Sequence, residues 1–122
     1  MIRNRLKILV FVAAATLLLS ACGKKEHFDI GLIVGKWVAG TEYWRYDGDG
    51  NGATWDVGDD VNEDEAQPFT WEFDDEENLL TQIHQMEMGG VIPKSYTLKR
   101  LDENTLAYAD RFDSTYTFKR VM

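Results

Sequence analysis

Residues 69–74 carry the pattern that most restricts the fold of this chain. The rings of Phe69, Trp71 and Phe73 alternate there with three polar residues. Successive side chains of a β-strand point to opposite faces, so this segment is predicted to be a strand with one buried and one solvated face. The same alternation returns over residues 96–100 and 116–119. A chain that repeats it is expected to form an antiparallel sheet.

Short runs of this kind fill the chain from about Leu32, and Gly, Asn and Asp separate them. The candidate strands are 36–46, 53–57, 68–74, 79–88, 91–101, 105–110 and 114–121. Residues 79–88 also have apolar residues at roughly helical spacing, but their composition and flanks favour a strand. The acidic residues 74–78 and the pair Gly89-Gly90 have the composition of turns. Together these features predict an all-β, antiparallel up-and-down barrel of about 7–8 strands, because closure removes the edges of such a sheet.

The N-terminal segment predicts where the protein is located. Three basic residues and an apolar run from Ile8 to Leu19 precede Ser20, Ala21 and Cys22. The run is shorter than the about 20 residues that a spanning helix needs. Small residues before a cut site are typical of a secretory signal. The pattern resembles a bacterial lipoprotein signal, in which residues 1–21 are removed and Cys22 becomes the palmitate-bearing membrane anchor. An unused thiol in a short signal anchor is the alternative.

Removal of the signal changes the charge of the chain. It takes away three of the 13 basic residues and none of the 21 acidic ones, and leaves 101 residues with a formal charge of −11. Such a charge argues against nucleic acid, whose binding depends on Lys and Arg. Residues 22–31 are expected to be a lipidated tether, and residues 32–122 one barrel domain without a disulfide, since Cys22 is the single cysteine. Gly23 replaces the Asp associated with inner-membrane retention, so we expect the periplasmic or surface face of the outer membrane.

One motif links the barrel to a known family. Gly35-Lys36-Trp37 opens the first predicted strand. In the last predicted strand, Arg120 follows Tyr116 and Phe118 at intervals of two residues, so its side chain is expected on the same face as their rings. Together with the Cys22 signal, this combination resembles the small lipocalin-like, calycin-type lipoproteins of bacteria. The resemblance implies that Trp37 packs at the closed end of the barrel beside Gly35, with the guanidinium of Arg120 across its ring. A cation over an indole contributes about 0.5–2 kcal/mol.

The resemblance also implies that the protein binds a small hydrophobic or amphipathic molecule. The aromatic residues have two interpretations that the sequence leaves open: they fill the core, or some of them line a pocket. The candidate ligand-lining residues are Trp44, Trp55, Phe69, Trp71, Phe73, Tyr96, Tyr108, Tyr116 and Phe118. Gln82, His84, Met86 and Met88 share parity and are expected to form a mixed polar and apolar patch.

Two acidic segments suggest further partners. Asp47, Asp49 and Asn51 match the opening of a calcium loop, but its twelfth position is Gly58 instead of Glu. A Gly-rich hairpin turn is favoured, and calcium is the alternative. Residues 56–65 carry six carboxylates and are expected to be extended and solvated. The alternative is a docking surface for a basic protein partner, as in an inhibitor of a basic secreted hydrolase such as lysozyme.

The sequence gives little support to catalysis. The two histidines, His27 and His84, have no nucleophile motif around them, and the carboxylates cluster in turns. A carboxylate in a solvated turn lacks the burial that raises the pKa of a general acid. We therefore expect a monomeric binding protein without catalytic residues, and with no cofactor or metal apart from the calcium alternative.

Overall fold

The computed structural model describes residues 26–122. The predicted signal 1–21 and Cys22 lie outside the described residues. Eight antiparallel strands form a closed barrel in chain order, which confirms the predicted fold class. Their bounds are β1 Gly35–Ala39, β2 Glu42–Tyr46, β3 Asn51–Asp56, β4 Gln67–Asp74, β5 Leu79–Gln85, β6 Val91–Leu101, β7 Thr105–Ala109 and β8 Thr115–Arg120.

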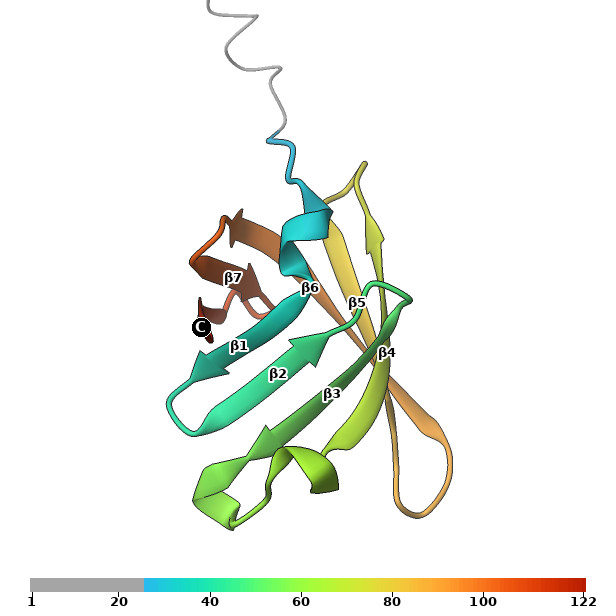
Figure 1. Cartoon of the computed structure of the whole chain (residues 1–122). Helices are drawn as coiled ribbons and strands as arrows, with labels where there is room; N and C mark the ends of the chain where they lie inside the picture. Colours follow the sequence, from blue (N-terminus) through green and yellow to red (C-terminus); the bar gives the residue numbers. More distant parts are fainter. Residues whose placement is uncertain (1–25) are drawn as a thin grey trace, which may run out of the picture.

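Three short 3₁₀ helices accompany the barrel: η1 Ile30–Ile33, η2 Val57–Asp59 and η3 Glu63–Glu65. Asp29 caps η1, because its Oδ1 accepts from the amide of Gly31 at 3.1 Å. Figure 1 shows η1 across one end of the barrel, while the β5–β6 hairpin and the β3–β4 connection project at the other end. Within residues 26–122, no helix combines the length and apolar character that crossing a membrane requires.

The predicted strand 36–46 is wrong, because it is a hairpin. Gly40 has a φ of 60° and turns the chain tightly, so that Ala39 pairs with Glu42. Positive φ costs glycine little, which explains its presence at this turn. A two-residue loop also moves the inward positions from odd to even numbers, from Trp37 to Trp44. The other predicted strands agree with the observed ones to within a few residues, and residues 79–85 form a strand.

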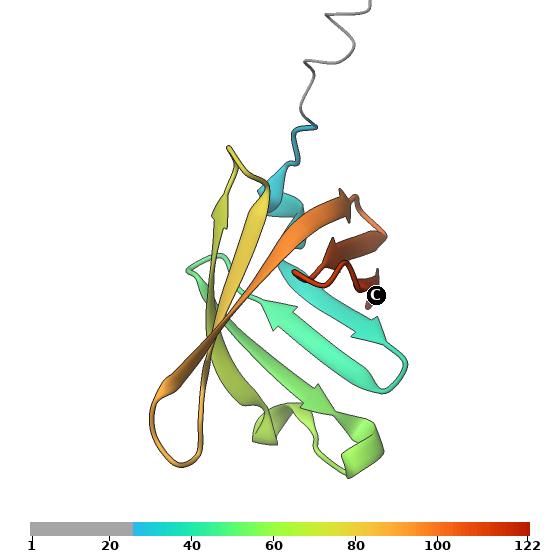
Figure 2. The same cartoon turned by 180° about the vertical axis from the view of Figure 1, so that it is seen from behind.

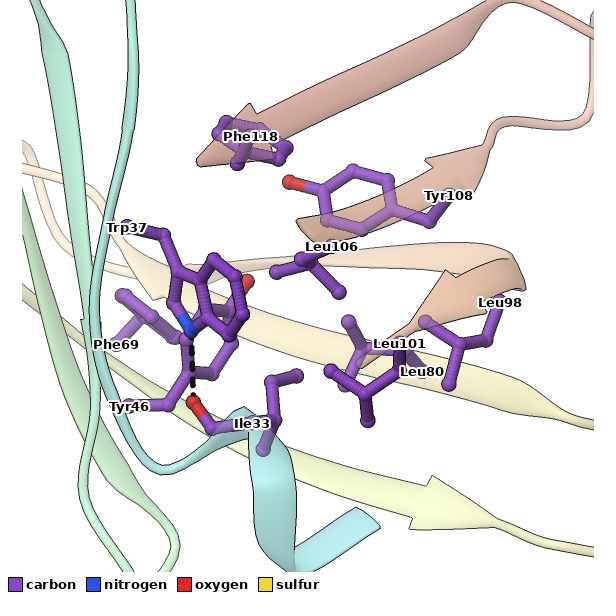
Figure 3. Close-up of a cluster of buried hydrophobic side chains, with 10 residues drawn as sticks. All are labelled: Ile33, Trp37, Tyr46, Phe69, Leu80, Leu98, Leu101, Leu106, Tyr108 and Phe118. Carbon is purple, nitrogen blue, oxygen red and sulfur yellow. Dashed lines mark hydrogen bonds between the residues drawn. The ribbon is translucent and has the colours of Figure 1, made fainter. Parts of the chain in front are cut away.

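The core lies next to η1, as Figure 3 shows for the buried side chains around Ile33 and Trp37. Ile33 and Trp37 are fully buried there, and rings and leucines from six further strands surround them: Tyr46, Phe69, Leu80, Leu98, Leu101, Leu106, Tyr108 and Phe118. Phe28 and Ile30, which belong to the predicted tether, also pack against this core. Because the strands, the cap and the core all lie within residues 26–122, a fragment 23–122 contains every element of the barrel.

Strand β6 gives the barrel an open side. A bulge between Leu98 and Arg100 shifts its register, and β6 pairs with β7 only from Thr97 onward. The first half of β6 pairs with β5 alone and extends away from the β7–β8 hairpin, as Figure 2 shows. Residues 91–96 therefore have no strand partner on the β7 side.

Candidate functional site

The closed end of the barrel is held by Trp37 and Arg120. Trp37 Nε1 donates to the carbonyl of Ile33 at 2.8 Å (Figure 3). The guanidinium carbon of Arg120 lies 4.2 Å from the centre of the Trp37 ring. The same guanidinium donates to the carbonyls of Glu103 at 2.6 Å, Val34 at 3.1 Å and Leu32. One side chain thus joins β8 and the β6–β7 turn to η1 and to Val34, and it covers Trp37 at this end of the barrel.

Gly35 makes room for that guanidinium. A Cβ at Gly35 would lie 2.6 Å from Arg120 Nη1, and the φ of Gly35 is 135°. Side chains other than glycine rarely adopt such a backbone conformation. The contact of Arg120 with Trp37 therefore depends on the absence of a side chain at Gly35. The resemblance to the lipocalin-like lipoproteins implies the same arrangement of these three residues.

A buried polar group crosses the middle of the barrel. Gln82 is fully buried, its Nε2 donates to the hydroxyl of Tyr46 at 2.7 Å, and its Oε1 lies 2.9 Å from His84 Nε2. An amide oxygen only accepts, so His84 Nε2 carries the hydrogen. Burial, and secondarily the charge of Lys94, lowers the pKa of His84. Neutral His84 and Gln82 thus form a polar floor between the core and the open end.

Aromatic rings also lie inside the barrel around Gln82 and His84. Trp44 meets Phe69, His84 and Phe118 edge-on at centroid distances of 5.5, 5.8 and 6.3 Å. On the opposite wall, Tyr96 lies 4.3 Å from Tyr108 and 6.1 Å from Tyr116. Tyr108 is buried, but Tyr116 is 44% exposed although it faces the interior. Trp44, Tyr96 and Tyr116 are therefore interior rings that remain partly accessible, and we call the region that they line the cup.

The structure divides the nine candidate ligand-lining residues into four groups. Trp44, Tyr96 and Tyr116 line the cup and are partly accessible. Phe69, Tyr108 and Phe118 are core residues. Trp71 and Phe73 lie toward the closed end, where Trp71 Nε1 donates to the carbonyls of Asp47 and Asn51.

Trp55 points away from the barrel interior, contrary to its expected place, and is buried on the outer face with 8% of its surface exposed. It pairs with Tyr43, one residue out of phase with Trp44, and stacks on the ring of Tyr43 at 5.4 Å. The interior positions of β3 are Gly52, Thr54 and Asp56. Gly52 is required there, because a Cβ would lie 2.5 Å from the ring of Phe69.

A groove opens beside the cup, between the first half of β6 and the β7–β8 turn. We call it the β6–β8 groove; it has a volume of about 520 Å³ and is lined by Pro93, Lys94, Ser95, Tyr96, Asp110, Arg111, Phe112 and Tyr116. Its volume lies within the range of about 300–1,000 Å³ typical of ligand sites. Phe112 is 75% exposed, and the guanidinium of Arg111 lies 4.8 Å from the centre of its ring.

A second hollow, of about 490 Å³, lies at the end of β3. Its wall is acidic and includes Glu42, Asp56, Asp59, Glu65 and Glu87. The segment 56–65 beside it is folded, so the expectation of an extended loop is wrong. Glu63 accepts from Lys36 at 2.6 Å and from Arg45 at 3.0 Å, which draws η3 onto the outer face of the barrel. The hydrogen bond from Lys36, and then that from Arg45, lowers the pKa of Glu63.

The residues of the calcium alternative form the β2–β3 turn. Asp47 pairs with Arg45 at 3.1 Å. Asp49 accepts from the amide and the side chain of Asn51 at 3.0 and 3.1 Å. Among residues 26–122, no group of three or more His, Cys, Asp or Glu side chains is arranged to hold a metal ion.

Sequence reasoning missed several residues of the open end. Glu42, Lys94, Arg111 and Phe112 were not singled out, although Lys94 shares the parity of Tyr96 on β6. The predicted patch of Gln82, His84, Met86 and Met88 does not form, because Gln82 is buried while Met86 and Met88 lie at the exposed β5–β6 turn. Comparisons with protein-family models, curated proteins and solved structures found no match for this chain.

Proposed function

We propose that this chain is a lipid-anchored, lipocalin-like binding protein of the bacterial envelope that holds a small hydrophobic or amphipathic molecule at its open end. The observation that carries the proposal is the partial exposure of interior rings above a closed core. Trp44, Tyr96 and Tyr116 face inward yet keep accessible surface. Burying the apolar surface of one such ring under a ligand contributes about 25 cal/mol per Å².

The division of the barrel supports a shallow site. The half of the barrel next to η1 is filled by the core and closed by Trp37 and Arg120, so a ligand would have room only toward the opposite end. The exposed apolar residues of the two neighbouring turns, among them Met86, Met88 and Phe112, surround that opening. A ligand seated there would cover rings on one side and remain open to solvent on the other.

The proposed anchor sets the direction in which this opening faces. The carbonyl of Glu26 accepts from Asn78 Nδ2 at 2.9 Å, in the β4–β5 turn at the closed end. Glu26 lies four positions after Cys22, which gives a reach of at most about 14 Å. If Cys22 carries lipid, the closed end stays beside the membrane and the cup faces away from it. The ligand would then come from the aqueous side.

Native mass spectrometry of the protein purified from its own host tests this function. We expect an added mass of a few hundred daltons that organic solvent removes. Replacing both Trp44 and Tyr116 by Ala should abolish the added mass, while Lys119→Ala, at an exposed position on the outer face of β8, should retain it. A protein that carries no added mass and binds no apolar dye would contradict the proposal.

The acidic hollow supports one second candidate, a docking site for a basic secreted protein. Five carboxylates on its wall would attract such a partner and speed its association. A pull-down with fragment 23–122 tests this function. Recovery of a basic protein that Glu42→Gln/Asp56→Asn releases would support it, and recovery of no protein would contradict it.

A further inference from the structure

The β6–β8 groove has a charge unlike the rest of the molecule. The chain carries 21 acidic and 13 basic residues, and the hollow at the end of β3 is acidic. The groove instead holds two cations, Lys94 and Arg111, and one carboxylate, Asp110. The net formal charge of the residues that line the groove is therefore positive.

The two cations have no carboxylate partner within the described part of the chain. Lys36, Arg45 and Arg100 all form ion pairs there, whereas Lys94 and Arg111 form none. Asp110 does not neutralise them through a contact, because its carboxylate shapes the β7–β8 turn. Its Oδ1 accepts from the amides of Phe112 and Ser114 at 2.9 and 3.0 Å, and its Oδ2 accepts from the hydroxyl of Tyr116 at 3.2 Å.

Aromatic rings stand beside these cations. Tyr96 and Tyr116 meet edge-on at 6.1 Å on the inner side of the groove, and Phe112 lies on its outer side under the guanidinium of Arg111. Rings bind apolar or aromatic bodies, and Lys and Arg bind anionic groups through charge-assisted hydrogen bonds. The groove thus combines the two kinds of contact that an amphipathic anion requires.

The acidic hollow also favours one orientation of a ligand that has a single anionic end. Glu42 faces the interior from the opposite side of the cup, and an anionic group is repelled there. A ligand with one anionic end is therefore favoured with that end at Lys94 and Arg111 and its apolar body toward Tyr96 and Tyr116.

From this arrangement we propose that the β6–β8 groove selects organic anions: a ring-bearing or aliphatic body that ends in a carboxylate or sulfonate. The inference rests on the proposed binding function and adds to it the chemical class of the ligand. Lys94 and Arg111 hold the anionic end, and the rings hold the body.

Two fluorescent probes that differ by one charged group test the proposal on fragment 23–122. The anion is 8-anilinonaphthalene-1-sulfonate, and N-phenyl-1-naphthylamine is its neutral counterpart. We expect Lys94→Gln/Arg111→Gln to weaken binding of the anion about tenfold or more, the effect of losing roughly one ion contact. Binding of the neutral probe should change less than about twofold, since the rings remain in place.

The control variant is Lys99→Gln/Lys119→Gln, which removes the same charge from exposed residues that do not line the groove. It should leave the binding of both probes unchanged. Both double variants should keep the cooperative melting of the parent, because all four side chains lie at the surface or at the open end. If the control weakens the anion as much as the groove variant does, the effect is one of net charge and the proposal is wrong.

The remaining outcomes separate this proposal from the binding function. If the parent protein binds the anionic probe no more tightly than the neutral probe, the proposed preference for anions is wrong, but the ring-lined site still stands. Stronger binding of a cationic naphthalene analogue also overturns it, in favour of the acidic hollow. Failure of every probe to bind, with no added mass in native mass spectrometry, overturns both.

Discussion

Arg120 covers the ring of Trp37 at 4.2 Å and binds backbone carbonyls on both sides of it. The two residues are neighbours across the β1–β8 seam, which has only two paired positions, Trp37 with Arg120 and Val38 with Lys119. The seam that closes the barrel therefore depends on side-chain contacts as well as on the strand ladder.

Arg120→Met should lower the free energy of unfolding by about 2–4 kcal/mol, because the aliphatic stem remains while the charged hydrogen bonds and the cation–π contact are lost. Urea unfolding of fragment 23–122 measures the change. Arg100→Met is the control: its ion pair with Asp102 is exposed, so a loss of less than about 1 kcal/mol is expected. Equal losses in the two variants would show that Arg120 has no special role at the seam.

Gly35→Ala should destabilise the barrel by about 1–3 kcal/mol, since Ala strains the backbone at this φ. The new Cβ also meets Arg120 Nη1, so part of the loss should disappear when Arg120 is Met as well. Gly40→Ala is the matched control, because its φ is also positive but nothing lies within 4 Å of its Cβ. Thermal melting of the two single variants and the double variant gives the coupling between Gly35 and Arg120. If the loss of stability in the double variant equals the sum of the two single losses, the residues are not coupled.

Glu63→Gln should release the segment 57–66 without unfolding the barrel. Its ion pairs with Lys36 and Arg45 are partly exposed, so the global loss should stay below about 1 kcal/mol. The measurement is the rate of proteolytic cleavage within residues 57–66, which should rise. Glu65→Gln, at the end of the same η3 helix, should leave the rate unchanged.

The pH dependence of the Glu63 contacts follows from the lowered pKa of this carboxyl. Above the unfolded value of 4.5, the ionised form contributes its full stabilisation. As the pH falls through the lower folded value, that contribution is lost. Cleavage of the parent segment should therefore accelerate in acid and approach the rate of Glu63→Gln, with an acid-active protease such as pepsin as the probe.

His84 should make the barrel less stable as the pH falls below 6.5. Its pKa is lowered in the folded protein, so the unfolded chain binds a proton more readily, and folding loses free energy between 6.5 and the folded value. His84→Gln should flatten this part of the stability curve, because Gln can still donate to Gln82. If the free energy of unfolding depends on pH in the same way in His84→Gln as in the parent, His84 is not the source of this pH dependence.

Lys94→Gln should raise the pKa of His84, because the charge of Lys94 contributes to lowering it. The sequence holds only two histidines, so the ring signals of His27 and His84 can be assigned and titrated by NMR. Lys119→Gln, on the outer face of β8, should leave the pKa of His84 unchanged.

Calcium should not stabilise the domain. The carboxylates of Asp47 and Asp49 already bind Arg45 and Asn51, and a cation would have to displace these contacts. Thermal melting at millimolar calcium should give the melting temperature found with chelator. A rise of several degrees that Asp49→Asn abolishes would restore the calcium alternative.

The sequence by itself determined the strands and the all-β class. Alternation has a period of two, so it can be recognised in one strand at a time, and residues 69–74 and 116–119 follow it. The same alternation placed Arg120 on the same face as Phe118. It did not determine the turn at Gly40, because residues 36–46 were predicted as one strand and only the pairing of β1 with β2 shows the hairpin.

The tertiary structure alone decided which rings form a site. Trp44 and Trp55 are both tryptophans in neighbouring strands, yet a register offset of one residue puts the first in the cup and the second outside. Lys94 and Arg111 are 17 positions apart and line the same groove, which opens beside the part of β6 that precedes Thr97 and does not pair with β7. Register and strand separation arise from contacts between distant segments, and no local pattern in the chain encodes them.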